Sequence, residues 1–227
     1  MPTDETAVAS LSSSFGFRYD GAMVDEFEYE RRFYCREFPD ECDDGDAPLL
    51  MVQSYFLHQD GFALRLRVQA RGVRVPMGSQ TDGLTTLMQH REAFQEAYIT
   101  VLGSPVSGTR YEAERTVDAD IAAEMILRGG TPIIKNRYSV WIGEDGWNID
   151  VFGANNAGLI VAKVERSSPV TNLLIPSFCT TEVTDDHRFY NDGLASRPFI
   201  TWRDDFLAGL HRDGAQYSQL FGENRYE

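Results

Sequence analysis

The sequence has few of the features that mark secreted, membrane-spanning or zinc-binding proteins. Only three of its 227 residues are cysteine, an odd number without metal-ligand spacing, so we expect reduced thiols rather than a disulfide framework. The four histidines are scattered and predict no zinc site. No stretch approaches the roughly 20 apolar residues that span a bilayer. Residues 1–15 lack the basic start and apolar core of a signal peptide. We therefore expect a cytoplasmic protein without a membrane partner.

Positive charge is also scarce. The chain has 21 Lys and Arg against 35 Asp and Glu, a formal net charge of -14. Such a protein matches the phosphate backbone of nucleic acids poorly, so we expect no nucleic-acid partner. Its hydrophobic content of 42% is sufficient for a core. No internal repeat is visible, and we predict a lead-in over residues 1–20, one domain over residues 21–211 and a tail over residues 212–227.

Short segments with alternating charged and apolar residues dominate the chain. In residues 24–35, Glu28, Glu30 and Arg32 share one face of a predicted strand and aromatic residues take the other. Similar strands are predicted at residues 62–69, 109–117, 133–141, 147–152, 159–165 and 178–184. Their charged faces carry Arg65, Arg67, Glu112, Glu114, Lys135, Arg137, Asp150, Lys163, Glu165 and Glu182.

Amphipathic segments predict helices at residues 118–128, with Asp118 as N-cap, at residues 201–211 and, more weakly, at residues 85–95. Such helices need an apolar surface, and the apolar strand faces supply it. The charged faces must then point at one another inside a closed sheet. Because desolvated ions cost several kcal/mol unless they are paired, such an interior holds water, metals or a charged ligand. The predicted fold is α+β, a closed antiparallel eight-stranded β-barrel with helices packed outside.

The order of these charged motifs, followed by Arg188, Tyr190 and Asn191, resembles the CYTH domain, the triphosphate tunnel metalloenzyme superfamily. This superfamily comprises inorganic triphosphatases, thiamine triphosphatases and class IV adenylate cyclases. The resemblance spans residues 24–199. It implies a metal-dependent triphosphatase that hydrolyses a phosphoanhydride of inorganic triphosphate, or of a similar compact triphosphate, inside a charged tunnel.

The resemblance also implies roles for individual residues. Glu28, Glu30 and Glu165 would hold Mg²⁺ or Mn²⁺, for which carboxylate oxygens are suitable ligands. Catalysis would rest on Glu28, Glu30, Arg32 and Lys135, mainly through placement and charge stabilisation. The implied substrate-binding residues are Arg32, Arg65, Arg67, Lys135, Arg137, Lys163 and Arg188. The implied supporting acids are Glu112, Glu114, Asp150 and Glu182.

Three positions depart from the family pattern. Arg32 stands where the first motif has lysine, Leu102 stands at another lysine position, and Lys163 replaces a glutamate. The changes at Leu102 and Lys163 fit either a relocated positive charge or a loss of catalysis. Two alternatives to hydrolysis therefore stay open: a noncatalytic sensor that binds polyphosphate or a nucleotide, and a class IV-type adenylate cyclase.

Overall fold

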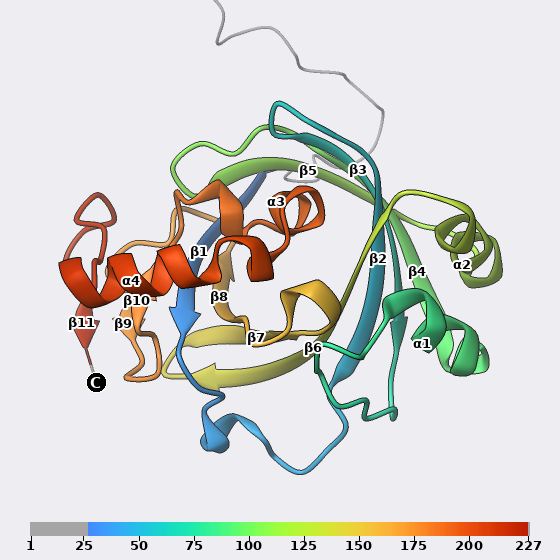
Figure 1. The fold of residues 1–227 in the computed structure, drawn as a ribbon. Coiled ribbons are helices and arrows are strands. Elements are labelled where there is room, and N and C mark those ends of the chain that lie inside the picture. Colours follow the sequence, from blue (N-terminus) through green and yellow to red (C-terminus); the bar gives the residue numbers. More distant parts are fainter. Residues whose placement is uncertain (1–26, 227) are drawn as a thin grey trace, which may run out of the picture.

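The computed structural model describes residues 27–226, and its centre is a closed barrel of eight strands. Around the barrel the strands follow the order β1, β5, β4, β3, β2, β6, β7 and β8, and β8 pairs with β1 to close it (Figure 1). Every neighbouring pair is antiparallel. The predicted fold class is confirmed. The strands are β1 (Phe27–Cys35), β2 (Leu49–Gln59), β3 (Phe62–Ala70), β4 (Phe94–Leu102), β5 (Thr109–Thr116), β6 (Thr131–Ile142), β7 (Asp145–Phe152) and β8 (Ile160–Arg166).

Two helices cover the outside of β2, β3 and β4, as the apolar strand faces require. They are α1 (Gly83–Gln89) and α2 (Ala119–Arg128), which lie beside these strands at the right of Figure 1. The carboxylate of Asp118 accepts a hydrogen bond of 2.9 Å from the Ile121 N–H, so the predicted N-cap is confirmed. The helix predicted at residues 85–95 is too long, because the buried Phe94 already begins β4.

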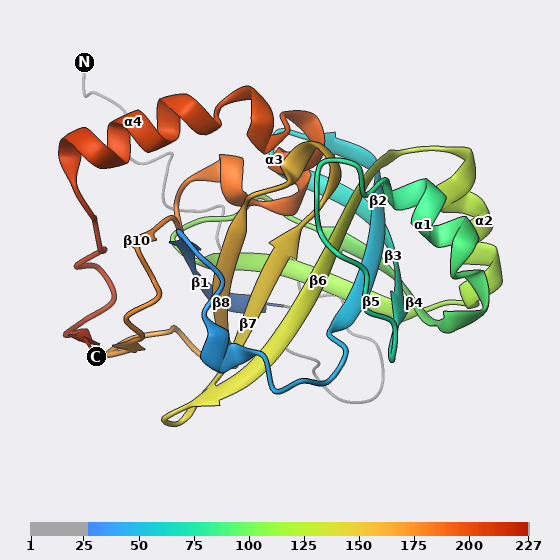
Figure 2. The same cartoon turned by 60° about the horizontal axis from the view of Figure 1, so that its bottom comes forward.

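An apolar cluster closes one end of the barrel interior. The helices α3 (Asn191–Ser196) and α4 (Arg203–Asp213) lie at this end, and α4 runs along the top of Figure 2. Here the inward side chains of Tyr55, Leu102 and Phe152 pack with Leu194 and Trp202. The charged inward positions lie deeper along the same strands. The interior is thus divided into an apolar closed end and a charged chamber.

Six of the seven predicted strands belong to the barrel. The segment predicted at residues 178–184 forms only β10 (Thr181–Glu182), which pairs with β1 outside the closed ring. The strands β2 and β4 complete the barrel instead. Short 3₁₀ helices connect the larger elements: η1 (Asp40–Cys42), η2 (Arg91–Ala93), η3 (Ala154–Asn156), η4 (His187–Phe189) and η5 (Phe199–Thr201).

The C-terminal residues fold back onto the outside of β1. Strand β11 (Arg225–Tyr226) pairs in parallel with β9 (Leu174–Ile175). Beneath this segment the fully buried Arg31 donates to Asn224 at 2.8 Å, and its guanidinium lies 4.8 Å from the Phe221 ring centroid. The described part of the predicted tail therefore contacts the barrel, whereas the predicted lead-in lies outside the described residues. Within residues 27–226, no helix is long and apolar enough to cross a membrane.

Candidate active site inside the barrel

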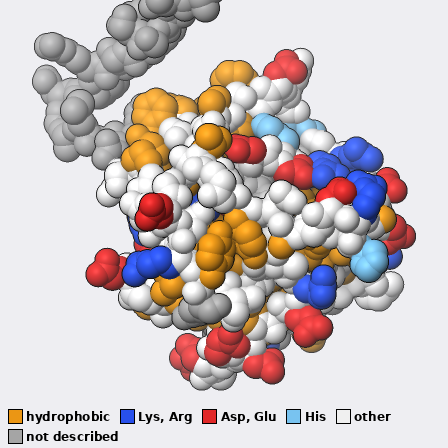
Figure 3. Space-filling model, turned by 90° about the vertical axis from the view of Figure 1, so that its left-hand side faces the viewer, with side chains coloured by type: hydrophobic (Ala, Val, Ile, Leu, Met, Phe, Trp, Pro, Cys, Tyr) orange, Lys and Arg blue, Asp and Glu red, His pale blue; other side chains and the backbone are white. Residues whose placement is uncertain are grey.

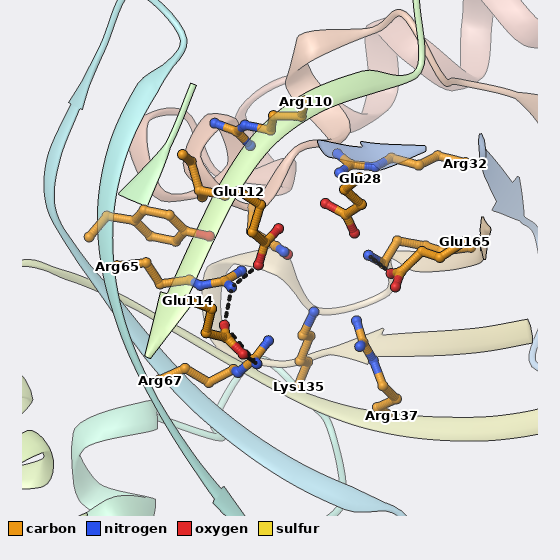
Figure 4. A pocket seen from close by; sticks show the side chains of 14 residues that line it. Glu28, Arg32, Arg65, Arg67, Arg110, Glu112, Glu114, Lys135, Arg137 and Glu165 are labelled. Carbon is orange, nitrogen blue, oxygen red and sulfur yellow. Dashed lines mark hydrogen bonds and ion pairs between the residues drawn. The ribbon is translucent and has the colours of Figure 1, made fainter. Parts of the chain in front are cut away.

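A cavity of about 210 Å³ lies inside the barrel and is lined almost entirely by polar side chains. Figure 4 shows these side chains converging from several strands on a common space. Its acidic lining residues are Glu28, Glu112, Glu114 and Glu165. Its cationic lining residues are Arg32, Arg65, Arg67, Arg110, Lys135, Arg137 and Lys163. A concentration of cations in a space of this kind is suited to a small polyanion.

Three carboxylates form an acidic cluster where β1 meets β8. Glu30 lies directly opposite Glu165 in the strand register, and oxygens of Glu28, Glu30 and Glu165 lie within 4.8 Å of one another. Within residues 27–226, Glu28 forms no ion pair. Burial and the neighbouring charges of Glu30 and Glu165 raise the pKa of Glu28 well above its usual range. This donor set of hard oxygens fits Mg²⁺ or Mn²⁺.

Two cations belong to the same cluster. Arg32 and Lys163 face each other across β1 and β8, and both bind the Glu30 carboxylate. Lys163 Nζ also lies 3.3 Å from Glu165 Oε1. Burial alone would lower the pKa of Lys163, but the charges of Glu30 and Glu165 raise it. The guanidinium of Arg32 lies 3.5 Å from the ring centroid of Tyr190, which fixes its orientation.

The opposite wall is built from β3, β4 and β5. Arg65 donates to Glu112 at 3.0 Å and to Glu114 at 3.1 Å. Arg67 donates to Glu114 at 2.9 and 3.0 Å, and the Thr100 hydroxyl donates to the same carboxylate at 2.8 Å. Glu112 and Glu114 therefore hold the two arginines in place.

A third wall comes from the hairpin of β6 and β7. Lys135 Nζ donates to Asp150 at 2.6 Å, and Arg137 donates to both Asp150 oxygens at 2.7 and 2.9 Å. The two cations hold the pKa of Asp150 far below its usual range despite burial. Burial, together with repulsion from Arg137 and Lys163, lowers the pKa of Lys135 even though Asp150 opposes this. An anion in the cavity would favour the charged form of this amine.

Two ionisable lining residues were absent from the predicted set. Arg110 shares the inward face of β5 with Glu112, so the alternation that located the acid also marked the arginine. Arg110 donates to both oxygens of Asp192 in α3, at 3.2 and 3.3 Å, and to the carbonyls of Gly61 and Gly103. Tyr55 is the other missed residue, and burial raises its pKa to about 12.

Two predicted site residues neither line the cavity nor form an ion pair with a residue that lines it. Glu182 pairs with Phe33 in the strand register, and Phe33 faces outward, so Glu182 binds Arg31 at 2.8 and 2.9 Å on the outside of β1. Arg188 donates to Asp186 at 2.6 Å, and its guanidinium lies 4.9 Å from the ring centroid of Trp202. Both are therefore removed from the set that could contact a ligand. Leu102 does line the cavity, on the wall across from Lys163.

Proteins that are similar to this chain in sequence or in structure include inorganic triphosphatases. No protein-family model matches the sequence. The chain is 28% identical over 111 residues to an inorganic triphosphatase of Acetivibrio thermocellus, which covers 48% of this chain and 71% of that protein. The crystal structure of the inorganic triphosphatase NE1496 is 25% identical, with a TM-score of 0.48 over 77% of this chain and 97% of that one. The Schizosaccharomyces pombe Mediator head module is 11% identical, with a TM-score of 0.40 over 62% and 82%.

The described residues thus form a closed antiparallel barrel around a charged chamber. The resemblance to the CYTH or triphosphate tunnel superfamily is confirmed by the sequence similarity to an inorganic triphosphatase.

Proposed function

We propose that this protein is a metal-dependent hydrolase that cleaves a phosphoanhydride of inorganic triphosphate or a similarly compact triphosphate inside the barrel. The observation that carries the proposal is a single cavity whose lining combines seven cationic side chains with the acidic cluster. At about 210 Å³, the cavity is smaller than the roughly 300–1,000 Å³ of sites for drug-sized ligands. This size favours a compact inorganic anion over a nucleotide.

In this proposal the cationic residues would bind the phosphate groups, and the acidic cluster would bind the metal ion. Arg65, Arg67, Lys135 and Arg137 would bind phosphate oxygens, each already aimed into the cavity by a carboxylate partner. Arg110 would contribute positive charge near the closed end.

On the other side of the cavity, Glu28, Glu30 and Glu165 would hold Mg²⁺ or Mn²⁺. The bound ion would supply Lewis-acid polarisation and charge neutralisation at the terminal phosphoryl group. Arg32, fixed against Tyr190, would stabilise charge on the phosphoryl oxygens during the reaction.

The test is phosphate release from inorganic triphosphate with Mg²⁺, with Mn²⁺ and with EDTA. We expect turnover that requires the divalent cation and that is lost in Glu28→Ala and Glu30→Ala. Pyrophosphate and ATP serve as comparison substrates. Absence of phosphate release by folded protein in both metals would overturn the proposal.

One observation favours noncatalytic binding as a second candidate. Lys163 already bridges Glu30 and Glu165, the carboxylates that a catalytic metal would use. For this candidate, calorimetry would show triphosphate binding without product formation.

A further inference from the structure

The ammonium group of Lys163 lies inside the acidic cluster. Its side chain is 9% exposed, and its Nζ contacts Glu30 and lies 3.3 Å from Glu165. Like charges face each other across these strands, with Glu30 opposite Glu165 and Arg32 opposite Lys163. Directly opposite like charges destabilise a sheet, so the diagonal contact from Lys163 to Glu30 relieves both repulsions.

The same carboxylates are the ligands that a divalent cation would need. An ammonium that donates to Glu30 and Glu165 competes for their oxygens with a metal ion. The three carboxylates together with Arg32 and Lys163 have a formal net charge of -1. If Lys163 leaves, the net charge becomes -2, which one divalent ion neutralises. Metal affinity therefore depends on where this amine lies.

The two cations of the cluster differ in their freedom to leave. Arg32 is held by the Tyr190 ring, and its backbone N–H donates to Thr184 Oγ1 at 3.2 Å. Lys163 has a flexible four-carbon stem. It lines the same cavity as the arginines, so its amine lies beside the space that a triphosphate would fill. Lys163 is the cation that can exchange a carboxylate partner for a phosphate oxygen.

We propose that Lys163 is a tethered counter-ion that gates the acidic cluster: it disfavours a divalent cation in the phosphate-free protein and leaves the carboxylates when a phosphate oxygen binds it. Triphosphate and metal then bind cooperatively, since each favours the same position of Lys163. This inference rests on the proposed triphosphate site but requires no hydrolysis.

The first test measures Mn²⁺ affinity by calorimetry without phosphate. Lys163→Met should bind Mn²⁺ about tenfold or more tightly than the wild type, because no charge-assisted hydrogen bonds need to break. Lys135→Met is the matched control: it removes the same charge from the same cavity, but its partner is Asp150 rather than the cluster. We expect a clearly smaller gain for this control. Lys163→Gln replaces Lys163→Met if the latter does not fold.

The second test uses the wild-type protein. Lys135 and Lys163 are the only lysines in the sequence, so ¹³C-lysine labelling gives two ε-methylene NMR signals, which either Met variant assigns. We expect an imido analogue of inorganic triphosphate, without metal, to shift the Lys163 signal.

Either of two results would refute the proposed role of Lys163. One is equal Mn²⁺ affinity in wild type and Lys163→Met. The other is an unchanged Lys163 signal when calorimetry shows that the analogue saturates the protein. A tight Lys163→Met complex and a shifted Lys163 signal in a protein that releases no phosphate would uphold the gate and refute only hydrolysis.

Discussion

Replacing Glu28 by glutamine should stabilise the metal-free protein while removing a metal ligand. The Glu28 carboxylate lies within 4.8 Å of oxygens from Glu30 and Glu165. Two unit charges at this distance repel each other by about 3.5 kcal/mol at an effective dielectric constant of about 20. Lys163 offsets much of this repulsion, and Glu28 is partly exposed. About 1 kcal/mol should therefore remain, which corresponds to a rise in Tm of about 2–4 °C for a chain of this length.

The pH dependence of this gain has a defined sign. The pKa of Glu28 is raised above its ordinary value of 4.5, so Glu28 contributes most to stability when it is protonated. That contribution is lost as the pH rises through the higher pKa of the folded state. The Tm difference between Glu28→Gln and wild type should thus be present at pH 7 and vanish near pH 4.

Differential scanning fluorimetry in EDTA measures the effect, and Glu114→Gln is the matched control. Glu114 accepts hydrogen bonds from Arg65, Arg67 and Thr100, so its replacement should cost about 1–3 kcal/mol and lower Tm. Mg²⁺ or Mn²⁺ should raise Tm in wild type and not in Glu28→Gln. A fall in Tm for both variants in EDTA would refute the reasoning that Glu28 is an uncompensated charge.

Two further changes separate residues of the cavity from residues outside it. Arg188→Ala should leave the affinity for inorganic triphosphate unchanged, whereas Arg67→Ala should weaken it by about tenfold or more. The reason is that, of these two residues, only Arg67 lines the cavity. Calorimetry measures both affinities, and equal losses would contradict this placement. Arg110→Met should destabilise the protein by about 3–5 kcal/mol, because it leaves the buried Asp192 without its ion-pair partner. Urea unfolding measures this cost, and a loss below about 1 kcal/mol would show that the ion pair between Arg110 and Asp192 contributes little to stability.

Much of the barrel could be predicted because its strands carry charged side chains on the inward face and apolar side chains on the outward face. Where one face is charged and the other apolar, a period of two locates the strand and its inward face, as in β1 with Glu28, Glu30 and Arg32. Strand β2 gives no such contrast, because Leu50, Met51, Val52 and Gln53 are buried on both faces.

Segment 178–184 shows the limit of the same rule. Its alternation predicted an inward Glu182, but only two residues pair with β1, and the register places Glu182 beside the outward Phe33.

The members of the site were easier to predict than their contacts. The period of two placed Arg65, Arg67 and Lys135 in the interior, and it would have placed Arg110 there as well. The contact between Lys163 and Glu30, two residues 133 positions apart in the chain, depends on the register of β1 against β8. No local pattern specifies that register. Arg188 lies in an irregular segment without periodicity, so its sequence neighbours gave no direction for its side chain.

The charge of the interior differs from that of the whole chain. The inward carboxylates are Glu28, Glu30, Glu112, Glu114, Asp150 and Glu165. Asp192, the buried partner of Arg110, is a seventh interior acid, and seven cationic residues line the cavity, so the interior is formally neutral and the overall -14 lies elsewhere. On the face in Figure 3, acidic and basic side chains are scattered among uncharged ones.

A polyanion that is repelled by the molecule as a whole therefore meets no net repulsion inside the barrel, where the lower dielectric strengthens each ion pair. Because the charges of the interior already balance, a divalent cation would not be needed to offset an excess of acid there. Under the proposed function its contribution would be to neutralise Glu28, the interior carboxylate that forms no ion pair within the described residues.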